Sequence, residues 1–318
     1  MSETLAAAPL KPSRWNQSSL QPFLDGLGPA RLKEDRKKLR RLFNAAASAP
    51  TAAAALKWAK ANDIKFIVDH TTRANGYYMV DTGVVAIANR LLLSEATRDI
   101  VVGTLVHEIR HGWQDKHGMI PTTGENFTDY YIRISLMEAD ATAHGEQARE
   151  EYAARRHVEQ LAQLYPDPSN YAPYSRKVQD LAAEKPAMML AHFKNWYTSW
   201  RPENYGDTAA KYFGHSLGIP DVIPTDHKIE FQPFTDGTAP QRLGIDHSQT
   251  EQLQLLGKSF DGNNYLARAS NHDMAQILSP TLAARFFRAS RKEPVPLVAR
   301  VLKRHEDLTR QRKRPVLV

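Results

Sequence analysis

The chain has 318 residues, 42% of them hydrophobic, 24% charged and 9% aromatic, a composition typical of folded globular proteins. The absence of cysteine excludes disulfide bonds, thiolate metal ligands and a cysteine nucleophile. The net charge of +7 is concentrated in residues 31–43 and 310–315. Such short basic runs are more typical of solvated faces and tails than of nucleic-acid sites, so we do not expect nucleic-acid binding.

The length predicts more than one structural part. We expect a helical segment at 1–55, a domain at 56–218, and an extension at 219–318 that is loop-rich, then helical, and ends in the basic tail. Residues 1–17 have no basic residue ahead of their short apolar run and are broken by prolines, unlike a signal peptide. No apolar run reaches about 18 residues either, so we expect a cytoplasmic protein without a membrane partner, while export without a cleaved signal stays open. The sequence predicts no particular oligomeric state.

Short helices and strands are expected in the first hundred residues. Helical patterns at 31–43 and 55–63 flank an alanine-rich run that Pro50 interrupts. A β-branched run at 64–70 indicates a strand, and residues 77–93 indicate two short strands joined by a tight turn. These segments predict a small sheet that contains a hairpin.

Two long helices follow the hairpin. The first is expected from Ser94, a suitable N-cap residue, to Gly118, a natural C-terminal stop. After a linker, a second is expected from Phe127 to about Arg156. Further helices are expected downstream, with loops at 165–174 and 201–207. The fold class is therefore mixed α+β and predominantly helical.

The first long helix contains the sequence HEIRH, and its spacing indicates a metal site. Four residues of α-helix turn through about 400°, so His107 and His111 project from one face and can share one cation. Glu108 lies on the neighbouring face, within reach of a water on the metal without being a ligand. This is the arrangement of the H-E-x-x-H motif, in which zinc lowers the pKa of the water and the glutamate accepts its proton.

The third metal ligand has three candidates: His117, Glu138, and the pair of Asp140 and His144. His117 matches the last histidine of the metzincin spacing, but Gln114 occupies the position of the glycine that lets that chain leave its helix. On a continuous helix His117 is about 15 Å from His107 along the axis and cannot reach the metal. Glu138 is favoured instead, because it is the single carboxylate in an apolar and small-residue stripe of the second helix, and an unpaired buried carboxylate is costly. An ion pair of Glu138 with an arginine such as Arg110 or Arg133 is the alternative.

Asp140 and His144 form another i, i+4 pair, on nearly the opposite face of the second helix from Glu138. Two roles are possible: a carboxylate that orients a metal-bound imidazole, or a simple surface pair. The pattern slightly favours the surface pair.

HEIRH followed by MEADA, with 26 residues between His111 and Glu138, resembles the gluzincin type of zinc metallopeptidase. More narrowly, HEIRHGWQ with EADA is similar to a bacterial family of putative metallopeptidases; the resemblance covers about residues 64–156. It implies Zn²⁺ on His107, His111 and Glu138, with Glu108 as general base. It also implies a zincin-like core, in which a small sheet packs on the HExxH helix beside a second, ligand-bearing helix. Thr142 departs from the gluzincin pattern, which has aspartate there, so the group that orients the histidines is unassigned.

The resemblance further implies how a substrate binds, as an extended peptide paired with an edge strand above the active helix. Residues 83–89 are the nearest candidate for that strand, and a plain core strand is the alternative. A hydrogen-bond donor for the attacked carbonyl is also needed, and Tyr205, Tyr212 and His215 are candidates.

The function we expect is a zinc-dependent metallopeptidase that acts on peptides or proteins. Hydrolysis of an amide in a non-protein substrate is a close variant. The alternative, from another class, is a non-catalytic interaction protein with a structural metal or none, which binds an acidic partner through its basic segments.

Overall fold

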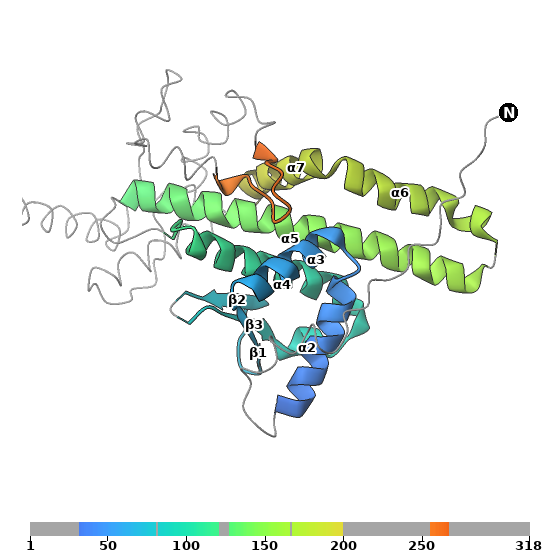
Figure 1. The fold of residues 1–318 in the computed structure, drawn as a ribbon, viewed down its shortest axis with the longest axis horizontal. Helices are drawn as coiled ribbons and strands as arrows, with labels where there is room; N and C mark the ends of the chain where they lie inside the picture. Colours follow the sequence, from blue (N-terminus) through green and yellow to red (C-terminus); the bar gives the residue numbers. More distant parts are fainter. Residues whose placement is uncertain (1–31, 81, 121–126, 166, 200–254, 267–318) are drawn as a thin grey trace, which may run out of the picture. The chain divides into compact units, whose positions relative to one another are not determined.

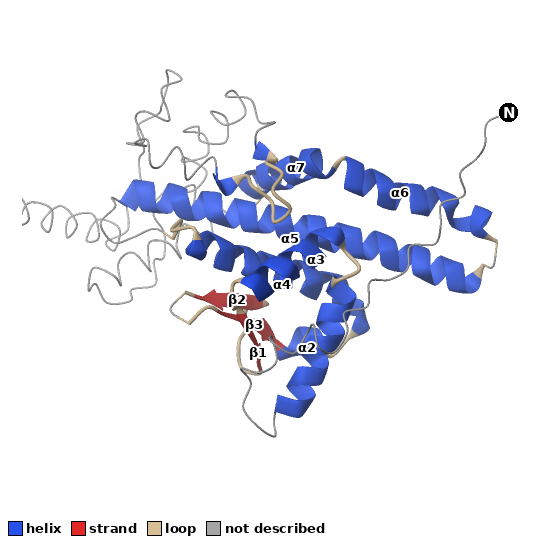
Figure 2. Cartoon of the chain, viewed as in Figure 1, coloured by secondary structure: helices blue, strands red, loops and turns tan. Residues whose placement is uncertain are grey.

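The computed structural model describes residues 32–80, 82–120, 127–165, 167–199 and 255–266 (Figure 1). The described chain is predominantly helical and contains one three-stranded sheet, so the predicted α+β class is confirmed (Figure 2). It divides into two compact units, one of residues 1–112 with 147–183 and the other of residues 113–146 with 184–318. The predicted domain boundary at 218/219 lies outside the described residues, and both predicted boundaries stay predictions.

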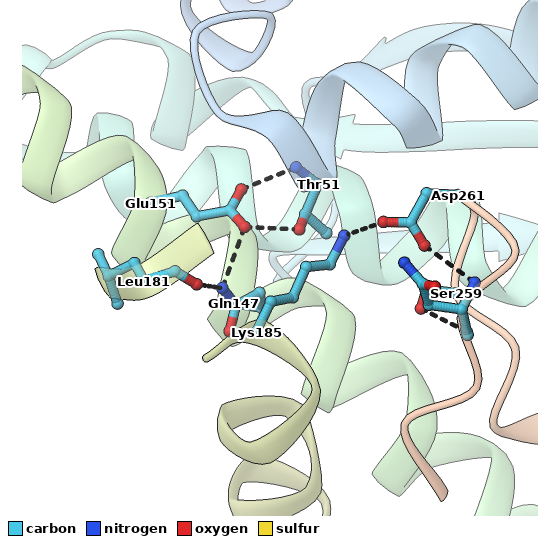
Figure 3. A network of polar contacts seen from close by, with 8 residues as sticks. Thr51, Gln147, Glu151, Leu181, Lys185, Ser259 and Asp261 are labelled. Carbon is cyan, nitrogen blue, oxygen red and sulfur yellow. Dashed lines mark hydrogen bonds and ion pairs between the residues drawn. The ribbon is translucent and has the colours of Figure 1, made fainter. Parts of the chain in front are cut away.

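The first unit opens with two helices, α2 (Leu32–Ala46) and α3 (Pro50–Ala61). The predicted break at Pro50 is confirmed: Pro50 opens α3, where its missing N–H disrupts no helical hydrogen bond. The next residue is held by a carboxylate from a distant helix. Glu151 accepts hydrogen bonds from the Thr51 backbone N–H at 2.7 Å and from its hydroxyl at 2.8 Å (Figure 3). This buried contact satisfies an N–H group that helix geometry leaves open.

The sheet of the first unit has the order β1-β3-β2. The strands are β1 (Lys65–Asp69), β2 (Gly76–Met79) and β3 (Val84–Ala88). β3 pairs with β1 in parallel and with β2 in antiparallel orientation, so the predicted hairpin is confirmed. Its turn requires Gly83, whose φ of +64° falls in the left-handed region that favours glycine.

The helix α4 (Arg98–Lys116) begins later than predicted. Ser94 does accept a hydrogen bond from the Ala96 backbone N–H, at 3.1 Å, but it caps the short 3₁₀ helix η2 (Glu95–Thr97) rather than α4. A second 3₁₀ helix, η1 (Asn89–Leu92), precedes it. The 3₁₀ helix η2 therefore replaces the first turn of the expected helix, and η1 lies before it.

The predicted stop of α4 at Gly118 is confirmed. Gly118 has a φ of +67°, its N–H donates to Asp115 O at 2.9 Å, and the Met119 N–H donates to Gln114 O at 2.9 Å. This pair of bonds is the Schellman motif, which satisfies the last carbonyl groups of a helix.

The second long helix, α5 (Phe127–Leu164), extends eight residues beyond the predicted end at Arg156. The predicted loop at 165–174 is wrong in part, because η3 (Pro168–Tyr171) occupies its middle and α6 (Ala172–Ala183) begins within it. Asp167 is the local cause, since its side chain accepts the Ser169 backbone N–H at 2.9 Å and opens the 3₁₀ turn. The predicted loop at 201–207 lies outside the described residues. No helix in the described ranges is long and apolar enough to cross a membrane.

The second unit contains α7 (Lys185–Thr198) and the separate segment Leu255–Leu266, orange in Figure 1. The Lys185 ammonium holds this segment through a 2.7 Å ion pair with Asp261 (Figure 3). Burial raises the pKa of Asp261, but the hydrogen bond and charge of Lys185 outweigh it and leave the pKa below its usual value. Asp261 therefore stays ionised and paired near neutral pH.

Candidate metal centre

His107 and His111 lie one turn apart on α4. Their Nε2 atoms are 3.0 Å apart, and the two rings are nearly perpendicular, at 84°. The helix around them is closely packed, since Leu105, Val106 and Ile109 are fully buried while both histidines keep partial exposure. Two ring nitrogens therefore point at one another from a rigid helix face that solvent can reach.

Glu138, on α5, completes a group of possible metal ligands. One ligand atom each from His107, His111 and Glu138 lies within 4.8 Å of the other two, the one such group in the described part of the chain. Donor atoms bound to one tetrahedral zinc ion are about 3.3 Å apart, given bond lengths of about 2.0–2.1 Å. The histidine pair is already close to that spacing, and the Glu138 ligand atom lies within 4.8 Å of both histidines. Two imidazoles and a carboxylate thus fit zinc in their chemistry, and the histidine pair also fits it in spacing.

The side chain of Glu108 is buried, with 7% of the residue exposed, and it lies against the start of the edge strand β2. A Cβ atom placed on Gly76 would be 2.9 Å from Thr104 Cγ2 and 3.1 Å from Glu108 Cγ. Both distances are shorter than ordinary contacts, so only glycine lets the strand approach the helix this closely. Gly76 lies between the predicted strand segments 64–70 and 77–93, and the sequence pattern gave no sign of this role.

A second close approach continues the first along α4. A Cβ atom on Gly112 would lie 3.2 Å from the Tyr78 ring and 3.3 Å from Ile64. Residues 104, 108 and 112 share one face of the helix, and β2 follows it through Gly76 and Tyr78. The backbone of β2 therefore runs directly past Glu108.

The expectation that residues 83–89 form a substrate-pairing edge is wrong. β3 is the central strand, with β1 on one side and β2 on the other, so neither of its edges is available. β2 has a strand neighbour on one side only within the described residues. The sequence pattern could not distinguish the two strands of the hairpin, because strand order depends on where β1 docks.

A partly buried hydrogen bond fixes β2 to the end of β1. The Tyr77 hydroxyl donates to Asp69 Oδ2 at 2.7 Å, and Asp69 Oδ1 accepts the Thr71 backbone N–H at 2.7 Å. The Thr71 N–H and the Tyr77 hydroxyl hold the pKa of Asp69 well below its usual value, and the same bond to Asp69, with burial, raises the pKa of Tyr77. The strand beside Glu108 is thus anchored at its first residues.

His117 is not brought to the histidine pair. It follows the last helical residue, its ring stacks on Trp113 with centroids 3.9 Å apart, and its Nδ1 lies 2.7 Å from Trp113 O. The ring is directed back along its own helix and is exposed. The expectation that His117 cannot reach the metal agrees with this position.

The expectation of a surface pair at Asp140 and His144 is wrong, because both residues are completely buried. His144 Nδ1 lies 2.9 Å from Asp140 O and 3.3 Å from Asp140 Oδ1. Helical periodicity identified the face on which they lie but not what covers it. The candidates for transition-state stabilisation, Tyr205, Tyr212 and His215, lie outside the described residues.

A protein family described as the putative metallopeptidase family matches residues 15–230. The chain belongs to this family. The matched range is more than half of the chain and includes all of the HEIRH helix and Glu138, but it ends before Leu255–Leu266. No curated protein and no solved structure matches the chain. Membership in the putative metallopeptidase family suggests a hydrolase that acts on peptides or proteins and implies a metal.

Proposed function

We propose that the protein is a zinc-dependent metallopeptidase of the gluzincin type, with a zincin-like core. The observation that carries the proposal is the group of His107, His111 and Glu138, whose ligand atoms lie within 4.8 Å of one another. Glu108, buried on the adjacent face of the same helix, is the general base in this proposal.

The composition of the group supports a catalytic rather than a structural metal. Structural zinc sites are closed by four protein ligands, whereas catalytic sites have three and keep one position for water or substrate. In the described residues three ligands are grouped, and the chain has no cysteine to supply a thiolate. When bound, zinc would lower the pKa of a coordinated water and polarise the substrate carbonyl.

Glu108 would accept a proton from the attacking water and later deliver it to the leaving amine, so that one carboxylate serves both halves of the reaction. Its burial supports this role, because the residues packed around a buried carboxylate hold it in position. Contact with Gly76 limits the rotamers available to its side chain.

Substrate is proposed to bind as an extended strand along β2 rather than along β3. The Ala88 N–H donates to Asn75 O at 3.0 Å, so Asn75 is a residue whose backbone bonds to β3. In an antiparallel pair every second residue does so. Gly76 and Tyr78 are the residues in between, and their backbone groups point away from β3. Those groups can pair with a peptide backbone. Since the same two residues lie against α4, the peptide would pass beside Glu108.

The decisive experiment uses purified full-length protein and a Glu108→Gln variant. We expect about one zinc per chain in both proteins by metal analysis, with cleavage of a mixed peptide library by the wild type alone. A general base contributes about 10²–10⁴-fold to rate, so residual activity should fall by at least that range. His117→Ala serves as a control that should keep both zinc and activity.

The alternative, an interaction protein with a structural metal, predicts a different result. It requires zinc in both proteins, no cleavage of any library peptide, and binding to acidic ligands. Cleavage by the wild type that persists in Glu108→Gln would also contradict the proposed mechanism. Mass analysis of the cleaved peptides would at the same time define the preferred side chains.

A further inference from the structure

Gln114 links the helix that carries the histidines to the turn that carries Glu138. Its amide Nε2 donates to Met137 O at 2.9 Å and to Asp140 Oδ2 at 2.8 Å, and the residue is fully buried. Gln114 is three residues after His111 on one continuous helix, and Met137 directly precedes Glu138. One amide group therefore holds the backbone carbonyl just before Glu138 and the carboxylate of Asp140, two residues after it.

Asp140 is the centre of this network. Its Oδ2 accepts from Gln114, and its Oδ1 accepts from the Tyr265 hydroxyl at 2.8 Å. Asp140 and Gln114 are 0% exposed and Tyr265 is 1% exposed. Hydrogen bonds to a buried carboxylate are stronger than neutral ones, and removal of one partner leaves a desolvated polar group. The chain Gln114–Asp140–Tyr265 is thus rigid and costly to break.

Tyr265 comes from a segment that is far along the sequence and is itself well anchored. The Tyr265 N–H donates to Gly257 O at 3.0 Å, and Lys258 pairs with Asn264 in a β-bridge. Gly257 is required in this turn because a Cβ atom there would lie 2.6 Å from Leu266 Cβ. The Tyr265 ring also packs edge-on to Phe193 of α7, with centroids 6.1 Å apart. Tyr265 is therefore presented to Asp140 by a fixed scaffold.

From this geometry we infer that Gln114, Asp140 and Tyr265 are positioning residues for the metal ligand Glu138. Leu255–Leu266 then belongs to the functional metal-binding unit, although it lies beyond the family-matched residues 15–230. The inference rests on the proposed function, since it takes Glu138 as a ligand. It also gives a role to Gln114, which stands at the position of the metzincin glycine. Gln114 connects α4 to the turn of α5 that carries Glu138.

Positioning matters here because zinc demands short and well-directed bonds. Ligand groups must be held within about 0.5 Å of their productive positions, and loss of the hydrogen bonds that orient them typically lowers metal affinity 10–100-fold. Tyr265→Phe removes only the hydroxyl that contacts Asp140 and keeps the ring against Phe193. It should therefore test orientation with little change in packing.

The test compares full-length wild type, Tyr265→Phe and a matched control, Asp261→Asn, which weakens the Lys185 ion pair of the same segment without contacting Asp140. Zinc affinity is measured by competition with a chromophoric chelator, and the visible spectrum of the Co²⁺-substituted protein reports ligand geometry. We expect Tyr265→Phe to weaken zinc binding about tenfold and to alter the Co²⁺ spectrum. Asp261→Asn should leave both unchanged even if it lowers the melting temperature.

The outcomes separate this inference from the proposed function. If the wild type takes up no zinc, the proposed function fails and the inference fails with it. If the wild type binds zinc and Tyr265→Phe binds it equally well with the same Co²⁺ spectrum, the inference alone is overturned. Equal losses in Tyr265→Phe and Asp261→Asn also overturn it, because segment docking alone then matters. Should Tyr265→Phe not fold, Gln114→Met removes the other donor at similar side-chain volume and is judged by the same readings.

Discussion

Two pairs of residues at i, i+4 spacing occupy the long helices, and they differ in what their polar atoms contact. His107 and His111 turn their Nε2 atoms toward each other at 3.0 Å, with a carboxylate oxygen in the same group. Asp140 and His144 are fully buried, and His144 Nδ1 lies within hydrogen-bond distance of Asp140 O. Gln114 and Tyr265 both donate to the Asp140 carboxylate. The first pair has the composition of a metal site, and the second has that of a scaffold.

The difference teaches that helical spacing alone does not identify a ligand. Both pairs place two metal-binding side chains on one helix face, and both sit in apolar surroundings. What separates them is that Asp140 accepts hydrogen bonds from a buried amide and a buried hydroxyl, whereas the two histidine nitrogens of the first pair face one another beside a carboxylate oxygen. The predictions below test whether this contrast holds.

The largest expected contrast is between two separate substitutions, His111→Ala in the first pair and His144→Ala in the second. His111→Ala should lower zinc affinity by more than about 100-fold, since it removes a ligand outright, and change the stability of the metal-free protein by about 1 kcal/mol or less. His144→Ala should destabilise the metal-free protein by about 2 kcal/mol or more, because it removes a fully buried ring. Chelator competition and urea unfolding measure the two quantities. Loss of zinc in His144→Ala with zinc retained in His111→Ala would reverse the assignment of the two pairs.

The second prediction concerns the third ligand. Glu138→Ala should reduce zinc affinity by about 100-fold, whereas His117→Ala should leave it unchanged because its ring is directed back toward Trp113. Zinc content after dialysis against a weak chelator separates the two variants. If the His117 variant is stripped and the Glu138 variant is not, the metal is held in a metzincin-like arrangement instead.

The smallest expected effect tests the strand beside Glu108. Gly76→Ala places a Cβ atom 2.9 Å from Thr104 Cγ2 of α4, so the strand must move away from α4 and peptide cleavage should fall about tenfold. Gly83→Ala, in the same hairpin, is the matched control: its φ of +64° makes it cost about 1 kcal/mol of stability, but its Cβ meets nothing closer than 4.0 Å. Zinc content should be normal in both. Equal rates in the two variants would mean that β2 does not position substrate.

Local chemistry made several features predictable. Pro50 and Gly118 act through their own backbone geometry, one at a helix start and the other in a left-handed stop, so both were assigned from neighbouring residues alone. The hairpin around Gly83 follows from the same kind of signal. The start of α4 was not predictable in this way, because Ser94 is an equally good cap for a 3₁₀ turn.

Features that depend on a distant neighbour were missed. The role of Gly76 requires a helix face that lies more than twenty residues downstream, and the burial of Asp140 requires a hydroxyl 125 residues away. Neither neighbour leaves a trace in the local pattern. The central position of β3, which excludes it as a substrate edge, likewise depends on β1.

The sequence by itself determined the spacing of His107, Glu108 and His111, because a helix of fixed pitch converts spacing into direction. Only the tertiary structure decided that the Glu138 carboxylate, on a separate helix, lies near both histidine rings. It also decided that Asp140 is buried and accepts hydrogen bonds from Gln114 and Tyr265. The physical reason is that helix geometry is set by contacts four residues apart, whereas the partner of a buried polar group is chosen by whichever distant segment packs against it.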